Sequence, residues 1–204
     1  MLLSMPIKRL CVYCGASSGA ALVYADTARI LAGELVNAGI ALVYGGGSIG
    51  LMGVIADEVM RLGGDVTGVI PKTLLEQEVG HHALSRLHVV ANMHERKAMM
   101  MDLADAFIAM PGGFGTLEEL FEVLTWSQLG LHEKPIGLLN TDGFFDGLVA
   151  FTRHQVETGF LSPAHSARLM HARLPAELLQ QFFDFIPPRI AKSFSRISAS
   201  ELLR

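Results

Sequence analysis

Residues 106–119 read AFIAMPGGFGTLEE, and this stretch decides the fold. The apolar run at its start predicts a buried strand, the glycine-rich segment a turn, and the pattern that follows the start of a helix. Without a Cβ, Gly112, Gly113 and Gly115 can adopt positive φ and let the backbone approach a ligand closely. The amides that open the helix point toward the same place, where the helix dipole favours an anion. The stretch therefore predicts a phosphate cradle with a carboxylate beside it.

The side chains of Thr116 and Glu119 admit two interpretations. A threonine followed three residues later by a glutamate is the pattern of a capping box, in which both side chains satisfy backbone donors. The same carboxylate can instead act as an acid or base in a reaction. On these residues alone the two interpretations have roughly even weight, since caps are common. Glu118 diverges from Glu119 by about 100° on a helix, so only one of them can face a given ligand.

Outside this stretch, short apolar runs alternate with longer amphipathic ones. The strand-like runs are Leu10–Tyr13, Ile40–Tyr44, Val66–Ile70, His88–Val90, Ala106–Met110 and Ile136–Leu139. The helix-like runs are Ala21–Ala38, Leu51–Leu62, Met93–Leu103, Thr116–Leu129 and Phe145–Thr158. Continuously apolar strands suit a parallel sheet that is covered on both faces. We therefore expect a single α/β domain over residues 1–204, doubly wound and Rossmann-like, with a mostly parallel sheet. From about residue 187 the tail is expected to be either a peripheral helix or partly disordered.

Composition narrows the possible function classes. The chain has 204 residues, 50% hydrophobic and 18% charged, with a net charge of −4. This size suffices for a full core without disulfides, and the surplus of apolar residues suggests an oligomer interface. The absence of a basic field argues against a nucleic acid polymer as partner. No apolar run is long enough for a membrane span or a signal peptide, so we expect a cytoplasmic protein.

A second glycine-rich segment, residues 45–50 (GGGSIG), follows one strand and precedes one helix. It formally satisfies the dinucleotide-binding pattern, which also needs an acid near the end of the next strand. That strand ends in Val69-Ile70-Pro71-Lys72 and supplies none, so the motif is weak support for NAD. The segment is either part of a ligand site or a tight turn without a ligand.

Cysteine and histidine spacing does not indicate a metal or redox centre. Cys11 and Cys14 lie at a strand end, and an offset of three places their side chains on opposite faces. Two cysteines cannot complete a zinc site, so buried thiols are expected. None of the histidines forms the i, i+4 pair with an intervening acid that marks a helical zinc site. We expect no metal.

Residues 93–97 (MHERK) supply the second part of a family signature. Together with PGGFGTLEE they resemble the phosphoribohydrolase family called "lonely guy", whose motif is PGGxGTxxE with an upstream arginine–lysine pair. The resemblance extends from residues 12–17 to about Leu139. It implies hydrolysis of the N-glycosidic bond of purine nucleoside 5′-monophosphates, cytokinin-type nucleotides and AMP, to free base and ribose 5-phosphate. It also implies water as second substrate, no organic cofactor, and a homodimer whose sites lie near a contact formed by residues 116–129.

The resemblance assigns roles to particular residues. Arg96 and Glu119 correspond to the catalytic pair of the family, although an arginine early in a helix is usually solvated. The positions expected to bind substrate are Glu78, Lys97, Gly112, Gly113, Phe114, Gly115, Thr116, Leu117, Glu118 and Thr125, with Ser17, Gly46 and Gly47 in the loops after the first two strands. Ser17 could alternatively cap a helix.

Two other functions compete with this hypothesis. A nucleotide- or cofactor-binding carrier of the same fold would need the glycine cradle but not the Arg96 and Glu119 pair. The older family label of lysine decarboxylase would require a lysine bound to pyridoxal phosphate as a Schiff base. Lys97 alone among the five lysines lies near the motifs, and there it resembles an anion contact.

Overall fold

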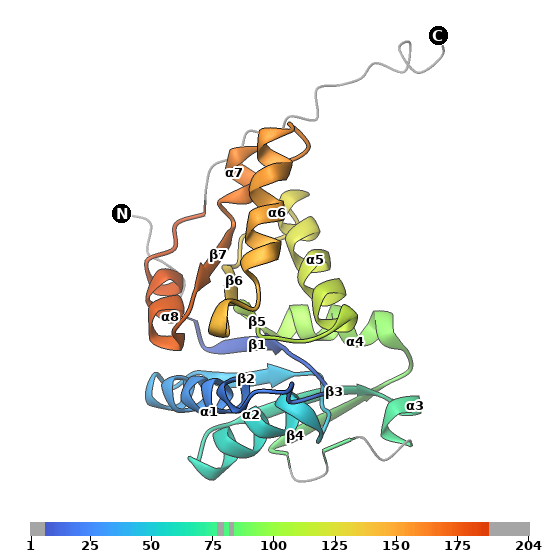
Figure 1. The fold of residues 1–204 in the computed structure, drawn as a ribbon. Coiled ribbons are helices and arrows are strands. Elements are labelled where there is room, and N and C mark those ends of the chain that lie inside the picture. Colours follow the sequence, from blue (N-terminus) through green and yellow to red (C-terminus); the bar gives the residue numbers. More distant parts are fainter. Residues whose placement is uncertain (1–6, 77–79, 82–83, 188–204) are drawn as a thin grey trace, which may run out of the picture.

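The computed structural model describes residues 7–76, 80–81 and 84–187, and its centre is a seven-stranded parallel sheet (Figure 1). The strand order is β4-β3-β2-β1-β5-β6-β7. The strands are β1 (Arg9–Tyr13), β2 (Ala41–Tyr44), β3 (Val66–Pro71), β4 (Arg86–Val90), β5 (Ala106–Ala109), β6 (Ile136–Leu139) and β7 (Leu169–Ala172). The order reverses between β1 and β5, which confirms the doubly wound α/β fold.

Helices cover both faces of the sheet. They are α1 (Leu22–Asn37), α2 (Gly50–Arg61), α3 (Lys72–Leu75), α4 (Met93–Leu103), α5 (Phe114–Gln128), the 3₁₀ turn η1 (Thr141–Gly143), α6 (Asp146–Glu157), α7 (Pro163–Ser166) and α8 (Pro175–Phe183). The helices fall into two groups, each of which packs on one face of the sheet through its own hydrophobic cluster. One cluster packs α1, α2 and α8 against the sheet, and the other packs α4, α5 and the start of α6 against it.

The predicted strands match the observed ones within two residues because central parallel strands are apolar along their whole length. All residues of β5 and β6 are buried, as continuous hydrophobic runs require. The sequence pattern did not predict β7 or α8. β7 lies at the sheet edge, and its four residues are mostly half-buried or exposed, so it lacks the apolar run that marks the other strands.

The two cysteines lie on opposite faces of the sheet, as predicted. Cys11 belongs to the cluster beneath α4 and α5, whereas Cys14 belongs to the cluster beneath α1 and α2. Both are free and buried, and burial raises the pKa of each thiol well above its ordinary value. These thiols are therefore packing residues. Among the described helices none is long and apolar enough to cross a membrane.

Two leucines of α1 provide a matched test of this core. Leu31 is fully buried and Leu22 is 82% exposed on the same helix. Leu31→Ala should lower the free energy of unfolding by about 2–5 kcal/mol because it leaves a cavity. Leu22→Ala should change it by less than about 0.5 kcal/mol. Urea denaturation followed by circular dichroism measures both, and equal losses would contradict the assigned packing of α1.

Candidate active site

The candidate site lies at the carboxyl ends of β1, β2 and β5, where the strand order reverses. The loops that follow β1 and β5 are joined by a hydrogen bond from the Gly15 N–H to the Pro111 carbonyl, at 3.0 Å. The Gly15 carbonyl in turn accepts from the N–H of Leu51, at the start of α2, at 3.0 Å. A Cβ on Gly50 would overlap the backbone of Ala16, so the loops pack backbone against backbone. Ligands of doubly wound sheets bind at this position.

The start of α4 fixes the position of Arg96. Asn92 is the N-cap residue, and its side chain accepts a hydrogen bond from the Glu95 N–H at 2.9 Å. The Glu95 carboxylate in turn accepts from the Ala91 N–H, one residue before the N-cap, at 3.0 Å. The Asn92 and Glu95 side chains therefore satisfy two backbone donors and fix the turn in which Arg96 lies.

Arg96 and Glu119 form a buried ion pair, although they are 23 residues apart in the sequence. Arg96 Nη1 lies 2.9 Å from Glu119 Oε1, and the two residues are 8% and 7% exposed. Arg96 Nε donates to the Val69 carbonyl at 3.1 Å. Its Nη2 donates to the Gly45 carbonyl at 3.4 Å. Arg96 is thus an anchored residue and not a solvated helix charge, because carbonyl groups from two strand ends hold its guanidinium.

Burial of the pair changes the acidity of Glu119. Desolvation raises the pKa of the Glu119 carboxyl from an ordinary value of 4.5 to about 6, and the nearby Arg96 charge offsets part of that rise. A carboxyl with a pKa near 6 exists in both protonation states close to neutral pH. It can therefore give or accept a proton there.

The first turn of α5 excludes the capping-box interpretation of Thr116 and Glu119. Gly113 is the N-cap residue and the helix begins at Phe114, so Thr116 lies inside the first turn, where its side chain is buried. No side chain caps α5 by a hydrogen bond. The capping interpretation of Thr116 and Glu119 is wrong because the helix begins three residues earlier than a cap at Thr116 would require.

The glycines of this turn serve packing and access, and the expectation of positive φ is wrong for all three. None of Gly112, Gly113 and Gly115 has a positive φ. A Cβ on Gly112 would overlap the Thr116 hydroxyl and lie 2.8 Å from the Gly15 nitrogen, so only glycine fits there. A Cβ on Gly113 or Gly115 would meet no heavy atom within 4 Å. These two positions leave the backbone open to a ligand.

Lys97 and Glu118 lie beside the buried pair and face a different direction. Lys97 Nζ forms ion pairs with Glu118 and, at 3.0 Å, with Glu122. The hydrogen bond that Lys97 Nζ donates to the Glu118 carboxylate is the main reason that the pKa of Lys97 is raised. The Glu118 side chain is more than half exposed, whereas Glu119 is buried. Adjacent positions on α5 therefore have separate environments, as the helical geometry predicts.

The loop after β2 supplies contacts that the sequence did not reveal. A Cβ on Gly45 would overlap Arg96 Nη2, so this glycine is required by Arg96 itself. Gly46 has a φ of +75°, which favours glycine. The glycine pattern indicated a ligand loop, but only the fold shows that the carbonyl of its first residue accepts a hydrogen bond from Arg96.

Among the described residues, Ser17, Phe114 and Thr125 make no hydrogen bond or ion pair with Arg96 or Glu119. Ser17 accepts a hydrogen bond from the Gly19 N–H at 3.2 Å and does not cap α1, whose N-cap is Ala21. Thr125 is exposed on α5, six residues or about 9 Å beyond Glu119. Phe114 is 93% exposed, and Glu78 lies outside the described residues.

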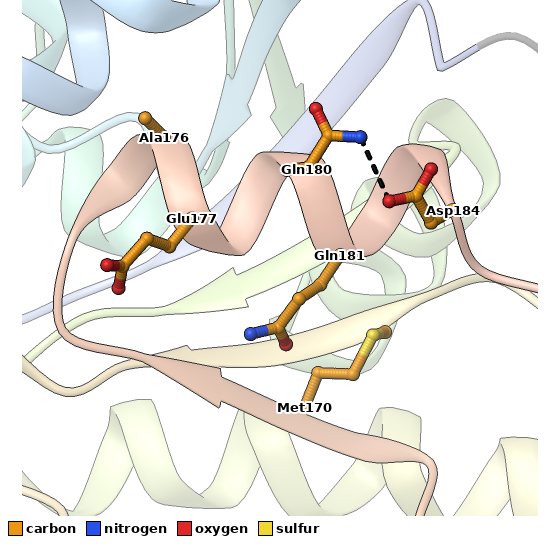
Figure 2. Close-up of a pocket in the computed structure, with 6 residues that line it drawn as sticks. All are labelled: Met170, Ala176, Glu177, Gln180, Gln181 and Asp184. Carbon is orange, nitrogen blue, oxygen red and sulfur yellow. Dashed lines mark hydrogen bonds between the residues drawn. The ribbon is translucent and has the colours of Figure 1, made fainter.

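Two other features of the described part of the chain do not form an alternative centre. A hollow between β7 and α8 is lined by Met170, Ala176, Glu177, Gln180, Gln181 and Asp184 (Figure 2). Its only hydrogen bond among these residues links Gln180 to Asp184, and it contains none of the predicted site residues. In the part of the chain that the structure describes, no group of three or more histidine, cysteine, aspartate or glutamate residues could hold a metal ion.

Comparison with known proteins gives the family. Residues 52–182 match a family described as "Possible lysine decarboxylase". The chain is 50% identical over 180 residues to the cytokinin riboside 5′-monophosphate phosphoribohydrolase LOG1 of Arabidopsis thaliana, covering 88% of this chain and 84% of the relative. A probable enzyme of the same name from Oryza sativa subsp. japonica, LOGL3, is also 50% identical, with 88% and 85% covered. The chain belongs to the cytokinin riboside 5′-monophosphate phosphoribohydrolase family.

The phosphoribohydrolase family shares its fold with more distant proteins. The molybdenum cofactor binding protein of Rippkaea orientalis matches with a TM-score of 0.64 at 21% identity, over 87% of this chain and 96% of that one. The molybdenum cofactor carrier protein of Chlamydomonas reinhardtii gives a TM-score of 0.65 at 19% identity, over 87% and 98%. At this identity the likeness shows the fold alone.

The raised pKa of Glu119 predicts a pH-dependent stability. The folded protein retains the Glu119 proton more strongly than the unfolded chain, so this residue contributes stability below pH 4.5 that is lost as pH rises through about 6. The loss amounts to about 2 kcal/mol. Glu119→Gln cannot titrate, so relative to wild type it should gain about that much between pH 4 and pH 7.5. Denaturant unfolding at both pH values measures the change, and a constant difference between the two proteins would contradict it.

Proposed function

We propose that this chain hydrolyses the N-glycosidic bond of purine nucleoside 5′-monophosphates, both cytokinin-type nucleotides and AMP, to free base and ribose 5-phosphate. One observation carries the proposal: the buried Glu119 carboxyl, held by Arg96, lies one and a half turns from the open amides that begin α5. That arrangement places an acid close to a site for an anion. The names of the relatives, at 50% identity, support the same substrate class.

The geometry suggests a role for each group in the reaction. The 5′-phosphate would lie on the N-terminal amides of α5, where Gly113 and Gly115 leave room. As the bond from the sugar C1′ to the base nitrogen breaks, its electron pair goes to the base and positive charge develops on the ribose. Ionised Glu119 stabilises that charge or takes a proton from the water that adds to C1′. Protonated Glu119 could instead donate its proton to the departing base.

The competing functions fit the structure less well. A decarboxylase that used pyridoxal phosphate would need a lysine amine able to lose its proton. Lys97 is paired with two carboxylates and the pKa of its amine is raised, which opposes that role. A carrier would have no use for a buried Arg96–Glu119 pair, whose burial has a free-energy cost.

We also propose a homodimer that forms through α5. Phe114, Phe121 and Leu129 are exposed at spacings of seven and eight residues, which places them on one side of the helix. Thr125 lies on the same side. Exposed apolar side chains at this spacing are typical of a contact surface. A contact there would explain why Thr125 faces away from the Glu119 of its own chain.

Product analysis tests the proposed reaction. Purified protein incubated with AMP or isopentenyladenosine monophosphate should release free base and ribose 5-phosphate, separated by chromatography. Glu119→Gln should lower kcat by about 10²–10⁴-fold because it removes the acid. Glu118→Gln is the matched control and should lower kcat far less, whatever its effect on KM, because the Glu118 side chain is more than half exposed and pairs with Lys97 instead of Arg96.

Two outcomes would contradict that assignment. Loss of activity in Glu118→Gln with an active Glu119→Gln would transfer the catalytic role to the neighbouring residue. Binding of AMP by calorimetry without turnover of either nucleotide would favour the carrier.

Sedimentation equilibrium tests the dimer. Wild-type protein should sediment as two chains of 22.0 kDa each. Phe121→Arg should shift it to the monomer, because a charge buried in an apolar contact is unfavourable. Leu22→Arg on α1, which packs on the opposite face of the sheet, is the control and should remain dimeric. A monomeric wild type would overturn the dimer proposal and leave the proposed reaction standing.

A further inference from the structure

The short segment Gly80–His81 is attached to the glycine loop Gly45–Gly47. The His81 N–H donates to the Gly46 carbonyl at 2.9 Å. Gly47 and Gly80 form an isolated antiparallel bridge next to it. Two backbone contacts therefore join a segment that follows α3 to the loop that follows β2.

The His81 side chain extends this attachment to α2. His81 Nε2 lies 2.9 Å from Asp57 Oδ1, and His81 is only 8% exposed. An ionised carboxylate can only accept, so the imidazole Nε2–H is the donor. Asp57 belongs to α2, the helix that begins directly after the glycine loop. His81 thus contacts the loop through its backbone and the helix behind the loop through its ring.

The glycine loop has little freedom to move without displacing Arg96. The Gly45 carbonyl accepts from Arg96 Nη2, and a Cβ on Gly45 would overlap that nitrogen. On the other side, a Cβ on Gly46 would lie 3.0 Å from Ile70 Cβ. A shift of the loop would therefore be transmitted to the guanidinium that holds Glu119.

We propose that the His81–Asp57 contact braces the glycine loop in the position that Arg96 requires, which makes His81 and Asp57 positioning residues for the reaction. The inference rests on the proposed function. Neither residue touches the Arg96–Glu119 pair directly, so the effect passes through Gly46 and Gly45. The brace acts on placement more than on folding, because the Asp57 side chain is 68% exposed and a hydrogen bond to a carboxylate so exposed adds little stability.

Steady-state kinetics of His81→Ala, Asp57→Ala and the double variant test the brace with AMP as substrate. Each single variant should lower kcat about tenfold with KM changed less than about twofold, because a small displacement of a catalytic group acts mainly on the transition state. The double variant should lose no more than His81→Ala alone, since Asp57 acts through its contact with His81. Asp57→Asn keeps an oxygen that accepts from the imidazole and should retain most of kcat.

Glu58→Ala is the matched control. Glu58 is the next residue of α2 and pairs with Arg61 on the helix surface, so its removal should leave kcat unchanged. Amide hydrogen exchange of a peptide covering residues 45–50 should accelerate in His81→Ala and Asp57→Ala, but not in Glu58→Ala. Unchanged exchange, losses that multiply in the double variant, or an equal loss in Glu58→Ala would overturn the brace.

Failure of the proposed function is recognised separately, because wild-type protein would then release no base. In that case the hydrogen exchange of residues 45–50 tests the brace by itself, with faster exchange expected in both alanine variants than in wild type. Exchange at the wild-type rate in His81→Ala and Asp57→Ala would overturn it.

Discussion

The ion pair between Arg96 and Glu119 constrains the rest of the site. Removing two charges from water is unfavourable, and their mutual attraction compensates only when the remaining donors are also satisfied. Here the carbonyls of Val69 and Gly45 accept from the other two guanidinium nitrogens. The ends of β3 and β2 must therefore keep a fixed position relative to the first turn of α4. The Asn92–Glu95 cap fixes that turn.

Glycine is needed around this pair for three different physical reasons. Gly45 leaves the space that Arg96 Nη2 occupies, and Gly112 leaves the space of the Thr116 hydroxyl. Gly46 supplies a positive φ beside them. Gly113 fills neither role, and its open position at the helix start leaves the amides accessible. The close packing at Gly45 and Gly112 and the open backbone at Gly113 together form a cradle for an anion.

Much of this arrangement could be predicted from local sequence, and the failures have physical causes. The buried strands were predictable because both faces of each are apolar, whereas edge strand β7 presents no such run. The spacing of Thr116 and Glu119 equals that of Asn92 and Glu95, yet only the second pair forms a cap. The two pairs differ because α5 begins at Phe114, directly after its N-cap Gly113, so Thr116 already lies inside the helix. The partner of Glu119 lies on another helix, so residue types along one helix could not reveal it.

The acidity of Glu119 follows from the same burial that makes the pair unfavourable for folding. Placed in solvent, this carboxyl would be ionised near neutral pH, and paired tightly in solvent it would be ionised further. Burial among the strand ends opposes ionisation more strongly than Arg96 favours it, so the pKa settles at about 6. A carboxyl of this acidity, fixed in one orientation by a guanidinium that is itself anchored twice, is poorly suited to stabilising a fold. It is well suited to moving a proton near neutral pH, and perturbed acids of this kind concentrate at reaction sites. The catalytic role that we propose for Glu119 would explain why stability is lost at this buried pair.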